Sequence, residues 1–179
     1  MMEEEYKRLI QRCTALAIKP TNEALTVSIR RQEMIFWTGG NKTSVFAVST
    51  SRNPPSCVID SFGTPTGLHA IADKVGDGEP LGTVFRYRLS LGKKFSEMEP
   101  EEQKKNLITT RFMRLRGLEK GHNSGERRDS YERLIYIHGT NHEEKIGKPN
   151  SAGCIEMRNK EILDLFNRVP TGTLVLIEE

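Results

Sequence analysis

His138 and Cys154 are the two residues whose side-chain types and spacing are best suited to covalent chemistry. A cysteine attacks as its thiolate, and a nearby histidine assists by taking the thiol proton and pairing with the resulting charge. The segment 139–153 separates them and is long enough to fold back and bring them together. Because Gly153 lets the backbone approach a substrate carbonyl closely, the amides of Gly153 and Cys154 are candidates for an oxyanion hole. The pattern predicts acyl transfer through a cysteine nucleophile.

His142 offers a competing interpretation of the same segment. It lies close to His138 in sequence and could join His138 and Cys154 as a ligand of a catalytic zinc ion. The run 141–144 around it is polar and charged, which is typical of a solvated loop. We therefore expect neither a metal nor another cofactor.

The motif that contains these residues resembles the active-site motif of the YkuD-type L,D-transpeptidases. It consists of His138-Gly139-Thr140 followed by Gly147, Pro149, Ser151, Gly153-Cys154-Ile155, Met157 and Asn159. Further stretches look like that family in the family's order, namely residues 64–67, 76–85, 110–111, 117–119 and 169–177. The resemblance covers about residues 25–178 and leaves the N-terminal segment outside it.

The resemblance implies a role for each matching residue. Cys154 would be the nucleophile and His138 the general base, with the carbonyl of Gly139 or of Ser151 orienting the imidazole. The amides of Gly153 and Cys154 would form the oxyanion hole. The family cuts a peptidoglycan stem peptide after its third residue, a diamino acid. This cut releases D-alanine and leaves an acyl-enzyme thioester, which an amine or water then resolves.

The chain departs from the family pattern at two positions beside the cysteine. Ala152 stands where the family often has His or Arg, and Glu156 stands where it often has Arg. An arginine there could pair with a substrate carboxylate, whereas a glutamate cannot. Arg158 or Arg111 could supply the missing charge. The candidate substrate-binding residues are thus Arg111, Thr140, Glu156 and Arg158, and Thr140 and Asn159 are also expected to brace the loop or cap the following helix.

The surrounding sequence predicts a mainly β domain of sandwich or barrel-like form with two helices. Apolar residues spaced by three and four predict a helix over residues 3–18, and a second helix is expected over 160–169, after the cysteine. Strands are expected over residues 25–29, 34–37, 44–49, 68–72, 84–91, 108–115, 134–137 and 173–177. The charged segment 96–106 is expected to be a short helix or an exposed insertion. We divide the chain into an N-terminal helix and linker, 1–22, and a catalytic domain, 23–179.

Composition excludes several other classes of protein. Lys and Arg number 27 against 24 Asp and Glu, and the two signs are interspersed, so we expect no nucleic-acid partner. No window approaches the roughly 18 consecutive apolar residues of a membrane span. The three cysteines are widely spaced, which predicts free thiols; Cys13 and Cys57 lie beside apolar residues and are expected to be packed.

The expected partners are peptidoglycan stem peptides or muropeptides, and the oligomeric state is left open. Residues 1–5 are acidic and no secretion signal follows them, so we expect a cytoplasmic location, or a periplasmic or cell-wall one if another export route exists. A cytoplasmic enzyme would meet soluble muropeptides and use water as acceptor, acting as an L,D-carboxypeptidase in muropeptide recycling. A third hypothesis is a catalytically silent peptidoglycan-binding domain, suggested by Ala152 and Glu156.

Overall fold

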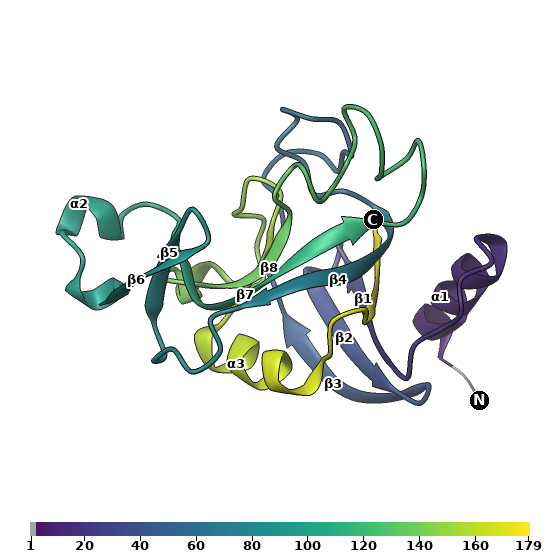
Figure 1. Cartoon of the computed structure of the whole chain (residues 1–179), viewed down its shortest axis with the longest axis horizontal. Helices are drawn as coiled ribbons and strands as arrows, with labels where there is room; N and C mark the ends of the chain where they lie inside the picture. The colour runs from purple at the N-terminus through teal and green to yellow at the C-terminus, as the bar shows by residue number, and fades with distance from the viewer. Residues whose placement is uncertain (1–2) are drawn as a thin grey trace.

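The computed structural model describes residues 3–179, which are built mainly from short β-strands (Figure 1). The strands are β1 (Glu23–Ser28), β2 (Glu33–Thr38), β3 (Asn41–Ala47), β4 (Gly67–Val75), β5 (Thr83–Arg86), β6 (Leu89–Lys94), β7 (Ile108–Gly117), β8 (Tyr136–Thr140), β9 (Ile155–Met157) and β10 (Leu174–Glu178). The helices are α1 (Glu4–Ala15), α2 (Pro100–Gln103) and α3 (Asn159–Arg168), with short 3-10 turns η1 (Phe95–Glu97) and η2 (Glu143–Lys145). Within residues 3–179, none of these helices has the length and apolar character needed to cross a membrane.

The strands described in residues 3–179 form one curled sheet. Its order is β3-β2-β1-β10-β4-β7-β5-β6, and β8 adds to β7 while β9 adds to β8. The pairs β1–β10 and β8–β9 are parallel and the others are antiparallel. The sheet curls into a half-barrel around α3, which confirms the predicted mainly β fold (Figure 1).

Alternation along the strands separates two apolar layers. Leu25 and Val27 of β1 point into the main core, which α3 closes with Ile162, Leu165 and Phe166. The residues between them on β1 point to the other face of the sheet, because successive strand residues alternate. One face of this part of the sheet therefore packs on α3 and the other on α1.

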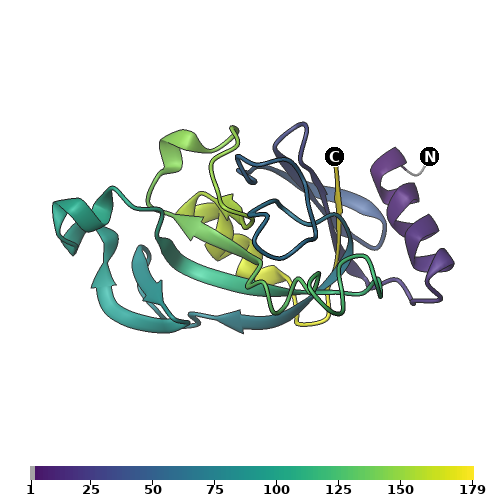
Figure 2. The ribbon, with the colours of Figure 1, turned by 90° about the horizontal axis from the view of Figure 1, so that it is seen from above.

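The predicted N-terminal helix packs on this outer face and does not stand apart. Tyr6, Leu9 and Cys13 of α1 are buried against a cluster that contains Trp37 and Leu174. The Tyr6 and Trp37 rings lie 5.3 Å apart, a separation typical of favourable aromatic pairs. Figure 2 shows α1 and α2 at opposite ends of the molecule.

The structure differs from the sequence prediction in two places, the segment 84–91 and the segment after Cys154. The strand expected over 84–91 is a hairpin, with β5 and β6 joined by Tyr87 and Arg88. These two residues have φ values of 50° and 68°, a left-handed conformation that is usually taken by Gly or Asn. Because neither residue is Gly or Asn, the sequence did not predict a turn here. The segment between Cys154 and the helix expected over 160–169, for which no strand was predicted, forms β9, which pairs with β8 and with Ser49.

His69 makes the stability of the fold depend on pH. Its ring is fully buried, with Nδ1 3.0 Å from the Gly67 carbonyl and Nε2 2.9 Å from Ser130 Oγ. Burial lowers the pKa of His69 from 6.5 to about 4, so between these values the unfolded chain binds a proton that the folded chain does not. Through this residue, the free energy of unfolding should fall by about 3 kcal/mol as pH drops from about 6.5 to about 4.

Urea unfolding at about pH 7 and about pH 4.5 measures this effect. We expect the wild type to lose more unfolding free energy between the two conditions than His69→Gln, which has no imidazole to protonate. Equal losses in the two proteins would show that His69 is not the source of the dependence.

Candidate active site

The register of β8 and β9 places the candidate catalytic side chains on one face of the sheet. Ile137 pairs with Ile155, and both point into the main core. Because side chains alternate along a strand, the flanking residues of β8 and β9 point to the opposite face. That face carries Tyr136, His138, Cys154 and Glu156, on the side of the sheet opposite α3. Cys154 packs there beside Tyr136, in a cluster completed by Phe85, Phe112, Val75 and Ile108.

His138 is held in one orientation by its own backbone neighbour. Nδ1 lies 2.7 Å from the Gly139 carbonyl oxygen. A carbonyl only accepts hydrogen bonds, so Nδ1 carries the proton and Nε2 is left as the basic nitrogen. Of the two carbonyls suggested from sequence, the one that contacts the imidazole is that of Gly139; the Ser151 carbonyl instead accepts the Arg52 amide at 3.1 Å.

The environment of His138 keeps its ring neutral in the resting protein. The residue is 5% exposed. Burial lowers the pKa of His138 from its ordinary value, while the Glu156 carboxylate and the Gly139 carbonyl act in the opposite direction. A neutral ring with a free Nε2 can act as a general base.

Cys154 is a partly exposed thiol whose sulfur lies among apolar rings. Its Sγ accepts the Tyr136 amide at 3.4 Å, and its S–H donates to the Leu134 carbonyl at 3.5 Å. Burial raises the pKa of the Cys154 thiol to about 12; Glu156 adds to the rise, whereas the Tyr136 amide and Arg133 oppose it. The resting group is therefore a thiol and needs a base in order to attack.

His138 carries the imidazole on the same face of the sheet as this thiol. It lies diagonally across from Cys154 on the adjacent parallel strand, since Ile137 and Ile155 are in register. In residues 3–179 no hydrogen bond joins the two side chains. Such contacts are commonly long in unliganded enzymes and close in the substrate complex. The arrangement thus places a neutral thiol and a neutral imidazole on one face of the sheet.

The turn before Cys154 is set by Ser151 and Gly153. Ser151 Oγ donates to the Cys154 carbonyl at 2.6 Å and accepts the Gly153 amide at 3.2 Å. Gly153 has a φ of 126°, which side chains other than glycine rarely allow. The Gly153 amide predicted for the oxyanion hole is thus paired with Ser151 in this structure, so Ser151 is the residue that an incoming oxyanion would have to displace.

Comparison with known proteins identifies the kind of domain to which this site belongs. Residues 22–177 match the family model described as the L,D-transpeptidase catalytic domain, YkuD. The chain belongs to this family. The match begins after α1 and includes every residue of the site described above.

Two curated relatives match this L,D-transpeptidase domain over shorter stretches. YqjB of Bacillus subtilis (strain 168), named as an L,D-transpeptidase, is 53% identical over 47 residues, which are 26% of this chain and 27% of that protein. ErfK/SrfK of Escherichia coli (strain K12), also named as an L,D-transpeptidase, is 53% identical over 45 residues, 25% of this chain and 14% of that protein. The matched stretches are therefore a minor part of both relatives.

Solved structures of L,D-transpeptidases share the fold. L,D-transpeptidase 3 from Mycobacterium tuberculosis, in complex with a faropenem-derived adduct, is 16% identical with a TM-score of 0.55, covering 88% of this chain and 60% of that one. The L,D-transpeptidase from Xylanimonas cellulosilytica is 16% identical with a TM-score of 0.54, covering 89% and 62%. Both likenesses concern the fold, since the identities are low.

Thr140 and Asn159 brace the L,D-transpeptidase site from behind. Thr140 is fully buried; its Oγ1 accepts the His142 amide at 3.1 Å and its carbonyl accepts Asn159 Nδ2 at 2.8 Å. Asn159 Oδ1 accepts the Thr109 hydroxyl at 2.6 Å. The bracing role expected for both residues agrees with these contacts, whereas a buried Thr140 is closed to substrate. The residue at the N-cap of α3 is Arg158, so Asn159 does not cap it.

Among the other candidates for substrate binding, Arg111 and Glu156 need correction, whereas Arg158 stays a prediction. Arg111 points away from the site, with its guanidinium 5.6 Å from the Phe166 ring centre and Nη1 donating to the Glu79 carbonyl at 2.8 Å. It does so because Phe112, the next residue on β7, takes the site face. Glu156 is 1% exposed and so closed to substrate. Arg158 contacts Glu161 at 3.5 Å and lines a separate cavity of about 590 Å³ beside the start of α3.

Arg133 is the cation near the thiol, and the sequence analysis missed it. Its guanidinium donates to the carbonyls of Ser56 at 2.9 Å and Gly63 at 2.8 Å, which ties it to the loop 48–66. Burial lowers the pKa of Arg133, and the neighbouring Cys57 and Cys154 sulfurs act in the opposite direction. Its position near the thiol cannot be predicted from its spacing to the motif, because loop packing determines it. The loops of residues 48–66 and 118–135 lie on the side of the sheet opposite α3 (Figure 1).

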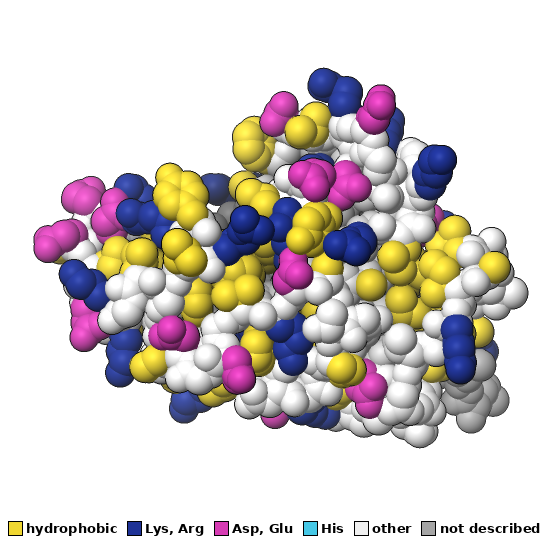
Figure 3. Space-filling view, viewed as in Figure 1, with side chains coloured by type: hydrophobic (Ala, Val, Ile, Leu, Met, Phe, Trp, Pro, Cys, Tyr) yellow, Lys and Arg dark blue, Asp and Glu magenta, His cyan; other side chains and the backbone are white. Residues whose placement is uncertain are grey.

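Two cavities are lined by neighbours of Cys154. One of about 230 Å³ is lined by Arg133 and by Leu134, whose carbonyl contacts Sγ. The other, of about 470 Å³, is lined by Phe85 and Ile108 from the Cys154 cluster and by Asn106. Figure 3, drawn in the view of Figure 1, shows hydrophobic side chains mixed with Lys and Arg side chains around the β5–β6 hairpin and in the middle of the molecule.

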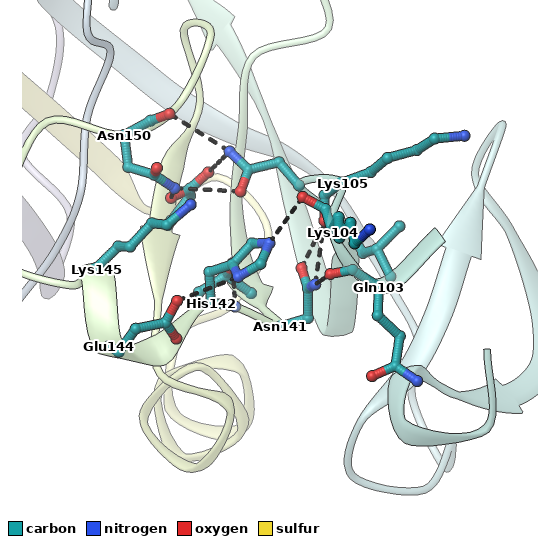
Figure 4. Close-up of polar contacts among 12 residues, drawn as sticks. Gln103, Lys104, Lys105, Asn141, His142, Glu144, Lys145 and Asn150 are labelled. Atoms are coloured by element: carbon teal, nitrogen blue, oxygen red, sulfur yellow. Dashed lines mark hydrogen bonds and ion pairs between the residues drawn. The ribbon is translucent and has the colours of Figure 1, made fainter. Parts of the chain in front are cut away.

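His142 contacts protein groups and lies away from the thiol. Its Nδ1 is 3.2 Å from Glu144 Oε1 and its Nε2 is 3.3 Å from the Lys104 carbonyl (Figure 4). Across residues 3–179, no three His, Cys, Asp or Glu side chains gather in a way that would hold a metal ion.

Gly139 is expected to tolerate no side chain in this domain. A Cβ there would lie 2.6 Å from the Thr109 carbonyl oxygen and 2.8 Å from Asn159 Oδ1, both in buried residues. Gly139→Ala should therefore lower the free energy of unfolding by about 2–3 kcal/mol, measured by urea unfolding. Ala152→Gly, the matched one-methyl change at an exposed site nearby, should cost under about 1 kcal/mol. Equal losses would contradict the predicted clash.

Proposed function

We propose that this domain is a cysteine acyltransferase of L,D-transpeptidase type that acts on peptidoglycan tetrapeptide stems. The observation that carries the proposal is the partly exposed Cys154 thiol on the same sheet face as His138, whose Nδ1 is held by the Gly139 carbonyl. Membership of the L,D-transpeptidase family over residues 22–177 supports the reaction class.

In the first step, the Cys154 Sγ attacks the carbonyl carbon of the third stem residue. The S–C bond forms and the C–N bond to the terminal D-alanine breaks. The thiol proton passes to His138 Nε2 and from there to the leaving amine, so free D-alanine and an acyl-enzyme thioester result. The Tyr136 amide, already 3.4 Å from Sγ, stabilises charge on the sulfur as the proton leaves.

In the second step, an acceptor resolves the thioester. An amine of another stem, or water, attacks the acyl carbon, the C–S bond breaks, and His138 passes the acceptor's proton back to the sulfur. An amine gives a cross-link and water gives a tripeptide. The same residues serve both outcomes, so the nature of the acceptor decides between a transpeptidase and an L,D-carboxypeptidase.

Two cavities beside neighbours of Cys154 are candidate surfaces for a bound peptide. Arg86 and Lys105 line the cavity of about 470 Å³, and Arg133 lines the one of about 230 Å³. The exposed side chains of Tyr87 and Leu89 on the β5–β6 hairpin add apolar surface nearby. Asp60 and Glu132 also line the smaller cavity, and Glu102 pairs with both Arg86 and Lys105, so these surfaces present both charge signs to a bound peptide.

Incubation with a disaccharide tetrapeptide, followed by mass spectrometry, tests the proposal. Tripeptide, D-alanine and cross-linked dimer together indicate transpeptidation. Tripeptide and D-alanine without dimer indicate the carboxypeptidase. Binding without any D-alanine release would reject the proposed function in favour of a catalytically silent peptidoglycan-binding domain.

The location of the protein determines which acceptors it meets. The cytoplasmic location expected from sequence stays a prediction. Cell fractionation tests it directly: recovery in the cytoplasmic fraction would favour soluble muropeptides and water as the partners of the reaction. Recovery with the wall fraction would favour stem peptides of the assembled wall.

A further inference from the structure

Glu156 is a buried carboxylate placed directly across from His138. The two residues are register partners on the parallel strands β8 and β9, and both point to the site face. Glu156 is 1% exposed and His138 is 5% exposed, so little water screens one from the other. A charged side chain at such a position is costly unless the structure satisfies it.

Two asparagine side chains satisfy this carboxylate. Asn106 Nδ2 donates to Oε1 at 2.8 Å, and Asn150 Nδ2 donates to Oε2 at 2.8 Å. Asn150 also donates to Asn106 Oδ1 at 3.2 Å, which locks the two amides together. Both partners of Glu156 are N–H donors, which match the ionised carboxylate, since a protonated one would place an O–H against a donor.

The asparagines come from segments that the fold itself has to bring together. Asn106 follows α2 in the inserted segment 95–107, and Asn150 lies in the loop between β8 and Cys154. Asn141 clamps the same two segments, with Nδ2 donating to the Gln103 carbonyl at 2.7 Å and Oδ1 accepting the Leu107 amide at 2.9 Å (Figure 4). A dedicated set of contacts therefore holds a negative charge beside His138.

We propose that Glu156, held by Asn106 and Asn150, is a positioning residue that acts on the reaction through the imidazole of His138. The role in catalysis rests on the proposed function. Glu156 touches no reacting atom: it favours the imidazolium that forms when His138 takes the thiol proton, in the way that a buried carboxylate assists a catalytic histidine. The Gly139 carbonyl orients the ring and Glu156 supplies the charge.

Among the side chains around His138, Glu156 is the charged one that acts on the imidazole ring. Phe112 is its neighbour on β7, Tyr136 precedes it on β8, and Cys154 and Glu156 face it from β9. Arg133 acts on the thiol. Glu156 also disfavours the Cys154 thiolate. It is the register partner of His138, however, and so faces the imidazole directly.

A titration of the His138 ring by NMR tests the electrostatic part of the proposal without any substrate. In a Cys154→Ala background, which removes coupling to the thiol, Glu156→Gln should lower the pKa of His138 by about one unit. Glu156→Asp, which keeps the charge, should restore most of it, and Glu144→Gln, which removes an exposed carboxylate elsewhere, should change nothing. A pKa of His138 that stays within about 0.2 units in a folded Glu156→Gln protein would overturn the proposal.

A second measurement needs no change at Glu156 and decides the matter if Glu156→Gln fails to fold. The Glu156 carboxyl carbon, observed by ¹³C NMR in the wild-type protein, should shift at the midpoint of the His138 titration. A carbon signal that is flat through that midpoint would equally overturn the coupling.

The pH profile of D-alanine release tests the catalytic part. Neutral His138 is the active form, so its pKa sets the acid limb of kcat/KM. Glu156→Gln should move that limb to lower pH by about one unit and lower the plateau by roughly threefold to tenfold, because the base is weaker. A limb that does not move would reject this role while leaving the acyltransferase standing. No D-alanine release by the wild type, with the NMR shift intact, would reject the proposed function and leave the coupling standing.

Discussion

Replacing Cys154 with alanine is expected to abolish D-alanine release from tetrapeptide stems, with a loss of at least about 10³-fold. The thiol is the nucleophile in the proposed reaction, and among residues 3–179 it is the sulfur that faces the same side of β8 and β9 as His138. The measurement is D-alanine release by the purified variant at matched protein concentration, with circular dichroism to confirm folding. Unchanged turnover would show that another group carries the reaction.

Cys57→Ala is the matched control for this prediction. Cys57 Sγ lies 3.7 Å from His122 Nε2, a thiol–imidazole contact that Cys154 and His138 do not make in this structure, and Cys57 is 5% exposed. It lies outside the motif, and its Sγ also lies 3.7 Å from the Thr66 carbonyl. We expect Cys57→Ala to keep D-alanine release within about twofold of the wild type. A loss equal to that of Cys154→Ala would mean that nearness to a histidine, and not the β8–β9 face, identifies the nucleophile.

Replacing His138 with glutamine is expected to lower the rate of Cys154 acylation by about 10²–10⁴-fold. The thiol has a pKa raised to about 12 by burial, so without a base little of it can attack near neutral pH. The rate is measured by intact-mass spectrometry during reaction with a carbapenem. Because direct ionisation then becomes the only route, the residual rate should keep rising with pH up to the thiol's own range.

His142→Gln is the control for the histidine. His142 lies in the same loop region and contacts Glu144 and the Lys104 carbonyl. Its loss should leave the acylation rate within about threefold of the wild type. If His138→Gln reacted as fast as His142→Gln, the base would have to be sought elsewhere.

Cys154 and His138 can be singled out from sequence as candidate nucleophile and base because the chemistry proposed for them imposes a local pattern. A glycine with φ of 126° must precede Cys154, and a residue free of a Cβ clash must follow His138, so glycines mark both places. The mainly β fold can also be predicted. Apolar residues alternate along strands and recur every three or four residues along helices, so buried faces leave a periodic pattern in the sequence. These patterns depend on neighbours along the chain.

What could not be predicted depends on contacts between distant segments. From sequence, Glu156 is a departure from the family pattern and a candidate for substrate binding, and its partner Asn106 lies 50 residues away in sequence. Arg111 looked like a candidate cation, but one position on β7 decides which face it takes, and Phe112 takes the site face. Arg133 reaches the thiol only through loop packing. The β5–β6 turn at Tyr87 and Arg88 lacked the residues that usually mark such turns.

The most direct test of the central claim is intact-mass spectrometry of the wild-type protein mixed with a tetrapeptide stem and quenched in acid within one turnover. The account predicts a covalent adduct with the mass of the tripeptide acyl group, located on Cys154 by peptide mapping, and one D-alanine released for each adduct formed. D-alanine release with an adduct on any other residue, or no adduct and no D-alanine at all, would contradict it.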